Sequence, residues 1–144
     1  MKKLLLSLTC AVLWTLSTNA QEIGVRFGDA SGGNVAIDAV FSAGEFSRIH
    51  ADVSFGSGGV GIDALWDFVY QPLGGEDLKW YAGAGPTVFI GDAFGLGVAG
   101  EIGLEYRFKD FPLAIGADWR PGLLLVQETD FVAGNFGFNV RWIF

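Results

Sequence analysis

Residues 134–144, GNFGFNVRWIF, are the stretch that decides the predicted fold. Their apolar side chains recur at every second position. One parity carries Phe136, Phe138, Val140, Trp142 and Phe144, and the other carries Asn135, Gly137, Asn139 and Arg141. Because successive side chains of a β-strand point to opposite faces of a sheet, this alternation predicts a strand with one apolar face and one polar face. The remaining sequence has to identify the medium that the apolar face contacts.

The same alternation recurs along residues 21–144, where glycine, proline and polar clusters separate successive strands. The predicted strands cover residues 22–28, 34–41, 48–56, 60–70, 79–90, 97–108, 112–120 and 131–144. No helical pattern interrupts them, and the connections are short. Short connections between consecutive strands favour an antiparallel up-and-down order. The sequence therefore predicts an all-β fold of eight antiparallel strands in one domain.

One face of these strands is apolar and free of charge along the whole region. Its central part is aliphatic, with Val25, Ile37, Val53, Ile62 and Ile102. Its aromatic residues gather toward the two strand ends. One end has Phe41, Trp66, Phe68, Tyr70, Trp80, Tyr106, Phe108, Trp142 and Phe144, and the other has Phe27, Phe55, Phe89, Phe94 and Trp119. Since 17% of the chain is charged, an uncharged face of this size is a pattern and not an effect of composition.

The opposite face collects the charged residues. Its members are Arg26, Asp38, Arg48, His50, Asp52, Asp63, Asp67, Glu101, Glu105, Arg107, Asp118, Arg120 and Arg141, which include all five arginines of the chain. A planar guanidinium pairs with several carboxylates at once, so arginine suits a confined polar space. We interpret the set as an ion-pair network that fills the inside of a barrel. An ion path or proton relay through His50, with Asp52 and Arg48, is the alternative.

Aromatic belts on both sides of an aliphatic band are typical of β-barrels that span a membrane. In hydrocarbon an open sheet edge would leave backbone groups unpaired at several kcal/mol each, so the sheet must close. We therefore predict a closed eight-stranded antiparallel up-and-down transmembrane β-barrel over residues 21–144.

Residues 1–20 have the pattern of a cleaved signal peptide. Lys2 and Lys3 precede an apolar run, and Ala20 ends a short segment of small residues. The single cysteine, Cys10, lies in this leader, so the predicted mature chain contains neither a disulfide nor a thiol. Without Lys2 and Lys3, sixteen acidic residues exceed seven basic ones, which argues against a nucleic-acid partner.

With these strands and faces, the chain resembles the small eight-stranded outer-membrane barrels of the OmpA/OmpX type. The resemblance implies an integral protein of the bacterial outer membrane with both termini in the periplasm. The terminal pattern Phe138, Val140, Trp142 and Phe144 is similar to the signal that such proteins present to the barrel-assembly machinery. Expected partners are therefore outer-membrane lipid, that machinery during biogenesis, and a protein partner in the same membrane.

The sequence predicts no catalytic residue, no metal ligand set and no cofactor. Because some barrels of this type are enzymes acting on lipid A or phospholipid, a lipid-modifying enzyme is the alternative function. His50, Asp52 and Ser54 share one strand face at ~7 Å intervals, too far apart for direct hydrogen bonds along a strand. Eight strands enclose too little space for a diffusion pore, so a narrow ion or solute conduit is a further alternative. The expected function is structural or accessory.

The last outer loop, Pro121 to Asp130, differs from the others. It contains the apolar run Leu123, Leu124, Leu125 and Val126. A strand extension or a plug over the lumen is one interpretation, and a docking surface for a protein or a lipid chain is the other. Lipopolysaccharide phosphates would meet these loops only through divalent cations bridging to acidic residues. Those residues are Asp29, Asp92, Glu128 and Asp130.

Overall fold

Eight antiparallel strands close into a barrel in the computed structural model, which describes residues 21–126 and 129–144. The predicted signal peptide and Glu128 lie outside the described residues. The eight wall strands are β1 (Glu22–Ala30), β2 (Gly33–Ser42), β3 (Arg48–Gly56), β4 (Gly59–Pro72), β5 (Leu78–Gly91), β6 (Phe94–Arg107), β7 (Leu113–Trp119) and β10 (Phe136–Ile143). Two further short strands are β8 (Gly122–Leu124) and β9 (Asp130–Val132). Within the described residues, no helix is long and apolar enough to cross a membrane.

Consecutive strands pair from β1 to β7, β7 pairs with β10, and β10 pairs with β1 to close the ring. The barrel wall follows the order β1-β2-β3-β4-β5-β6-β7-β10, and every pairing is antiparallel. The prediction of a closed eight-stranded up-and-down barrel is confirmed.

The short strands β8 and β9 extend two wall strands rather than adding new ones. β7 and β8 both pair with β6 and are separated only by Arg120 and Pro121. Proline has no backbone N–H to donate, so the ladder is interrupted there. β8 pairs with β9, which leads into β10. Within the predicted loop from Pro121 to Asp130, Gly122–Leu124 form β8 and Asp130 begins β9, so its described part includes a strand extension.

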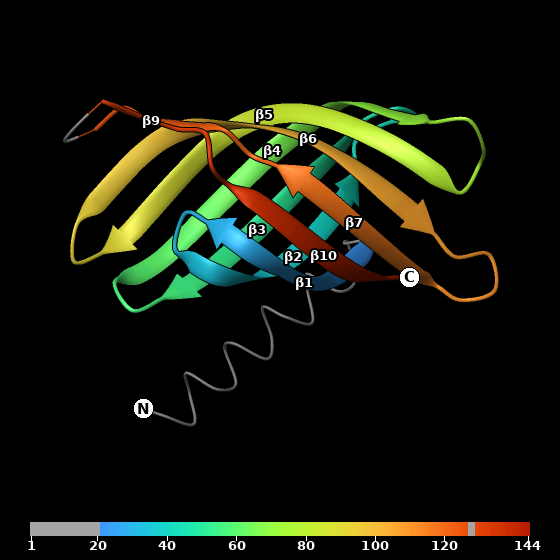
Figure 1. Cartoon of the computed structure of the whole chain (residues 1–144), viewed down its shortest axis with the longest axis horizontal. Helices are drawn as coiled ribbons and strands as arrows, with labels where there is room; N and C mark the ends of the chain where they lie inside the picture. The colour runs from blue at the N-terminus through green and yellow to red at the C-terminus, as the bar shows by residue number, and fades with distance from the viewer. Residues whose placement is uncertain (1–20, 127–128) are drawn as a thin grey trace.

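Both described ends of the chain lie at the same end of the barrel (Figure 1). Glu22 pairs with Ile143, and the Phe144 N–H donates to the Gln21 carbonyl at 2.9 Å. We call this the termini end. The tight turns after β1, β3 and β5 lie at the opposite end, beside β8 and β9, which we call the β8–β9 end.

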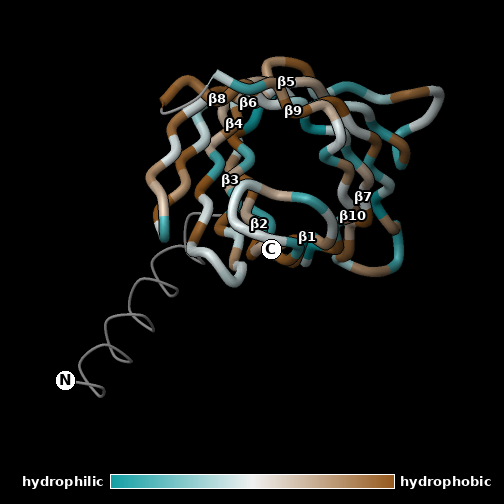
Figure 2. Tube along the Cα trace, turned by 60° about the vertical axis from the view of Figure 1, so that its left-hand side comes forward, coloured by the Kyte–Doolittle hydropathy of each residue, from teal (hydrophilic) through white to brown (hydrophobic). Residues whose placement is uncertain are grey.

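Polar and apolar residues alternate along the wall strands (Figure 2). On β3, for example, Arg48, His50 and Asp52 are buried, whereas Ile49 and Phe55 are 43% and 49% exposed. The barrel thus has a polar interior and an apolar outer surface, the reverse of a water-soluble barrel.

A bulge in β4 reverses this alternation near the termini end. The pairing of β4 with β5 shifts register between Asp67 and Val69. One extra residue in a strand turns every later side chain to the other face. The prediction that Tyr70 faces outward is therefore wrong: its hydroxyl donates to Glu105 Oε1 at 2.8 Å inside the barrel. The assignment of Phe89 to an aromatic belt is wrong for a different reason: Phe89 shares the inward parity of Tyr81 and Thr87 on β5, and it lines the cavity at the β8–β9 end.

Several inward positions are glycine because neighbouring backbone comes very close. A Cβ at Gly24 would collide with the Val140 carbonyl oxygen and would lie 2.6 Å from Arg141 Cα. We expect Gly24→Ala to lower the free energy of unfolding by roughly 1–3 kcal/mol, the usual cost of overpacking. Urea unfolding in lipid vesicles, followed by tryptophan fluorescence, measures this change.

Gly75→Ala is the matched control, because nothing lies within 4 Å of a Cβ at Gly75. We expect its free energy of unfolding to stay within about 0.5 kcal/mol of the parent. Equal stability of the two variants would contradict the close approach at Gly24.

Candidate functional site

Charged side chains fill the barrel lumen. Of the predicted lumen residues, Arg107 is partly exposed and the other twelve are buried. The lumen also contains polar residues that the sequence analysis did not include: Glu22, Tyr70, Tyr81, Thr87 and Asn139. Glu22, Tyr81, Thr87 and Asn139 share the polar parity of their strands, so the alternation alone could have located them. Tyr70 could not be found in this way, because the bulge in β4 leaves no trace in the pattern.

Arg141 on β10 is the centre of the ion pairs nearest the termini end. Its Nε lies 2.8 Å from Glu22 Oε2, its Nη1 lies 3.1 Å from Asp38 Oδ2, and its Nη2 pairs with Glu105. Arg107 pairs with Glu22 and with Glu105. One buried guanidinium therefore joins carboxylates from β1, β2 and β6.

Arg48 on β3 reaches across the lumen. Its Nε lies 2.8 Å from Asp67 Oδ2 on β4, and its Nη1 lies 2.8 Å from Glu105 Oε2 on β6. Its guanidinium also lies 4.3 Å and 4.4 Å from the ring centres of Tyr70 and Tyr81. Aromatic faces attract cations, so the two rings help to hold this guanidinium in place.

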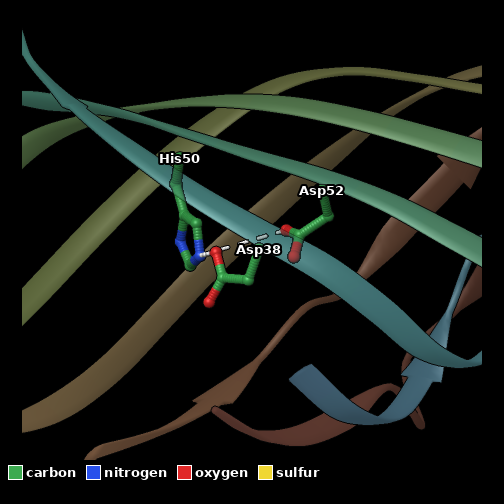
Figure 3. Close-up of side chains that lie close together, drawn as sticks. All are labelled: Asp38, His50 and Asp52. Atoms are coloured by element: carbon green, nitrogen blue, oxygen red, sulfur yellow. Dashed lines mark hydrogen bonds and ion pairs between the residues drawn. The ribbon is translucent and has the colours of Figure 1, made fainter. Parts of the chain in front are cut away.

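His50 is fully buried inside the barrel, and its side chain lies beside Asp38 and Asp52 (Figure 3). Its Nε2 is 2.6 Å from Asp38 Oδ1, and its Nδ1 is 3.0 Å from Glu101 Oε1. Asp52 Oδ2 is more distant, at 3.9 Å. An ionised carboxylate only accepts hydrogen bonds, so both ring nitrogens must donate. This arrangement fits a charged imidazolium that bridges β2 and β6.

Arg120 links the centre of the lumen to the β8–β9 end. Its Nε lies 3.0 Å from Glu101 Oε2, and its Nη1 pairs with Asp52. Asp118 lies 3.4 Å from the same Nε and pairs with Arg26 at 2.6 Å. The ion pairs therefore form a connected network along the barrel axis.

The network contains more carboxylates than cations. Eight buried carboxylates face four buried arginines, the partly exposed Arg107 and His50. Asp52 Oδ1 and Asp67 Oδ1 are buried and have no hydrogen-bond partner among the described residues. The lumen consequently contains an excess of carboxylate groups over cationic groups.

Two groups of described residues have the ligand types of a metal site. They are Asp38, His50 and Asp52, and His50, Asp67 and Glu101, with ligand atoms within 4.8 Å of one another. Both depend on His50, whose two nitrogens already face carboxylates. Arg120 Nη2 lies 3.2 Å and 3.3 Å from those nitrogens. A guanidinium at this distance repels a further cation, so the arrangement favours an ion-pair network over a metal centre.

His50 and Ser54, the possible base and nucleophile of a hydrolase, do not contact each other and have different hydrogen-bond partners. The Ser54 hydroxyl accepts from the Gly32 N–H at 2.8 Å and donates to the Gly61 carbonyl at 3.4 Å. His50 is occupied by Asp38 and Glu101. Among the described contacts, the Ser54 hydroxyl therefore has backbone partners and no side chain that could act as its base. That the protein has no enzyme activity stays a prediction.

A cavity of about 470 Å³ opens at the β8–β9 end. Its walls are mainly apolar and include Phe89, Phe94, Leu123, Leu124, Val126 and Val132. Its polar lining includes Ser31, Asp63, Thr87 and Arg120. Three residues of the predicted docking run therefore line this cavity, whereas Leu125 is not among its lining residues and is 52% exposed.

The predicted assembly signal lies on the outer face of β10 and runs along it toward the termini end. Phe138, Trp142 and Phe144 are 47%, 52% and 68% exposed, and Val140 is partly exposed.

Comparisons with protein-family models, with curated proteins and with solved structures found no match for this chain.

Proposed function

We propose that this chain is an integral β-barrel of the bacterial outer membrane, with a sealed lumen and a structural or accessory role in the envelope. The observation that carries the proposal is the reversed polarity of the barrel. Large apolar side chains cover its outside, including Ile62, Trp66 and Leu104 at 42%, 57% and 48% exposure. Apolar surface costs about 25 cal/mol per Å² in water, and soluble monomers rarely expose large continuous apolar patches. A lipid bilayer removes that cost.

The distribution of the aromatic residues supports this orientation. Trp66, Phe68, Tyr106 and Trp142 are exposed on strand segments toward the termini end, and Phe27, Phe55 and Phe94 are exposed toward the β8–β9 end. Aliphatic residues such as Ile37 and Ile62 lie between them. Tryptophan and tyrosine favour the headgroup region of a bilayer, so each belt would lie at one of the two membrane–water interfaces.

The sidedness follows from the predicted signal peptide and from the position of the termini. Export through the inner membrane would leave the termini end in the periplasm and the β8–β9 end outside. The pattern Phe138, Val140, Trp142 and Phe144 would then be presented to the barrel-assembly machinery. Outer-membrane lipid, and a protein partner in the same membrane, complete the proposed set of partners.

Ion pairs across the lumen favour a sealed barrel over a conduit. Arg48 and His50 on β3 contact Glu105 and Glu101 on β6, and Arg120 after β7 contacts Asp52 on β3. These strands lie on opposite sides of the ring. Opening a path would separate buried charges from their partners, at a cost of several kcal/mol for each broken pair.

Fractionation followed by bilayer recording tests this proposal. We expect the protein to stay in the outer-membrane fraction after an alkaline wash. We also expect the purified barrel to insert into planar bilayers without discrete conductance steps, compared with a known porin as the positive control. Release by the alkaline wash would contradict the membrane assignment. Reproducible single-channel steps would instead favour the narrow conduit.

A further inference from the structure

The cavity at the β8–β9 end combines an apolar wall with a buried carboxylate that is not fully paired. Asp63 on β4 is only 4% exposed, and it is one of the cavity's lining residues. Its Oδ1 accepts a hydrogen bond from the Thr87 hydroxyl at 2.5 Å and another from the Ser31 hydroxyl. This one oxygen therefore uses both of its lone pairs on hydroxyl donors.

The second oxygen of Asp63 has no hydrogen bond from the described residues. Its nearest described cation is Arg120, whose Nη1 lies 4.0 Å from Oδ2. That guanidinium is already engaged by Asp52 and by Glu101 at closer range. Asp63 Oδ2 is not among the fully buried atoms that lack a partner, so it keeps accessible surface in a residue that lines the cavity and can accept a hydrogen bond from a ligand there.

The charge around the cavity points to the class of ligand. Asp29 and Asp130 line it together with Asp63, and Arg120 is the only basic residue among its described lining residues. An anionic ligand would meet three carboxylates and one guanidinium that is already paired. A cation would instead gain a favourable interaction with Asp63 and would offset part of the acidic excess of the lumen.

We propose that this cavity binds a small amphipathic amine. Its ammonium group would donate to Asp63 Oδ2, and its apolar part would lie against Phe89, Phe94 and Leu124. The cavity volume of about 470 Å³ is within the range of roughly 300–1,000 Å³ that is usual for small-molecule sites. The site goes beyond the envelope role proposed above and does not depend on it, because the cavity belongs to the barrel itself.

Binding of 2-phenylethylamine tests the proposal. At pH 7 this amine carries one positive charge, while 2-phenylethanol and 3-phenylpropionate are its neutral and anionic counterparts of similar size. The full mature chain is placed in nanodiscs of zwitterionic lipid, protein-free nanodiscs serve as the blank, and binding is measured by calorimetry. We expect the amine to bind at least about tenfold more tightly than either counterpart. Equal or tighter binding of the alcohol or the acid would overturn the proposal.

Two variants locate the site. Asp63→Asn keeps the shape of the side chain but removes its charge, and we expect it to weaken amine binding about tenfold or more while leaving 2-phenylethanol unchanged. Asp110→Asn is the matched control, because Asp110 is exposed near the termini end, and it should bind the amine as the parent does. Unchanged amine binding by a folded Asp63→Asn variant would overturn the proposal.

Gly95→Leu provides a test that leaves Asp63 in place. A Cβ at Gly95 would lie 3.4 Å from Phe89 Cβ and 4.0 Å from Leu124 Cδ2, so the backbone accepts a side chain there and the leucine would occupy the cavity. We expect this variant to lose binding of the amine. Retained binding would show that the amine lies elsewhere, and this result decides the question even if Asp63→Asn fails to fold.

Discussion

Replacing Arg141 by methionine is expected to lower the free energy of unfolding by roughly 3–5 kcal/mol, the largest effect of any single change considered for this barrel. Arg141 is fully buried and is paired with Glu22, Asp38 and Glu105. Methionine retains much of the aliphatic stem but removes the guanidinium, so the three carboxylates lose a shared partner inside a lumen that is already acidic. Urea unfolding of the protein in lipid vesicles measures the difference.

Lys109→Met is the control for this experiment. Lys109 also forms an ion pair, with its Nζ 3.1 Å from Asp77 Oδ2, but its side chain is 70% exposed at the termini end. Water and salt screen such pairs, so we expect no measurable change in stability. Arg141→Lys should be intermediate, because an ammonium keeps the charge but cannot reproduce the planar arrangement of donors. If Arg141→Met were as stable as the parent, the ion pairs would not support the barrel.

Replacing Ile37 by arginine is expected to destabilise the protein in a bilayer by roughly 2–4 kcal/mol, the cost of a cationic side chain on the lipid face of a barrel near the midplane. Ile37 is 43% exposed on the outer face of β2, where its paired neighbours are Val25 and Val53. An exposed position in water would tolerate arginine to within about 0.5 kcal/mol. Ile37→Arg is therefore expected to lower the stability strongly if the outer face contacts lipid and only slightly if it contacts water.

Ile37→Ala separates the effect of charge from the effect of lost side-chain volume. We expect it to cost clearly less than Ile37→Arg, because alanine remains apolar. Both variants are compared by urea unfolding in vesicles and by the yield of folded protein in membranes. Equal stability of Ile37→Arg and the parent would mean that the outer face contacts water, and the proposed membrane location would be withdrawn.

The strand pattern could be predicted because it depends on local alternation. Each wall strand shows a period of two, and the short connections leave an antiparallel order as the simplest arrangement. The predicted strand over residues 112–120 ends where the structure interrupts the wall between β7 and β8, and the continuation into β8 and β9 is one of two interpretations that the sequence leaves open. The burial of Glu22 follows from the same alternation, because Glu22 shares the polar parity of Arg26 on its strand.

The bulge in β4 could not be predicted from the alternation of side chains. Phe68 and Tyr70 continue the apolar alternation of Ile62 and Trp66, so the sequence assigns all four to one face. The register shift between Asp67 and Val69 turns Tyr70 inward, where it contacts Glu105 and Arg48. A bulge depends on the pairing with the neighbouring strand, and a single strand carries no record of that pairing.

The sequence by itself determined that this chain forms a β-barrel with an uncharged outer face and a charged lumen, because alternation within a strand sets which side chains share a face. Only the tertiary structure decided which charges meet. His50 contacts Glu101, and Arg141 contacts Glu105, across distances along the chain of 51 and 36 residues. Those contacts depend on the closure of the ring and on the stagger between paired strands, which bring distant inward positions to the same height in the lumen.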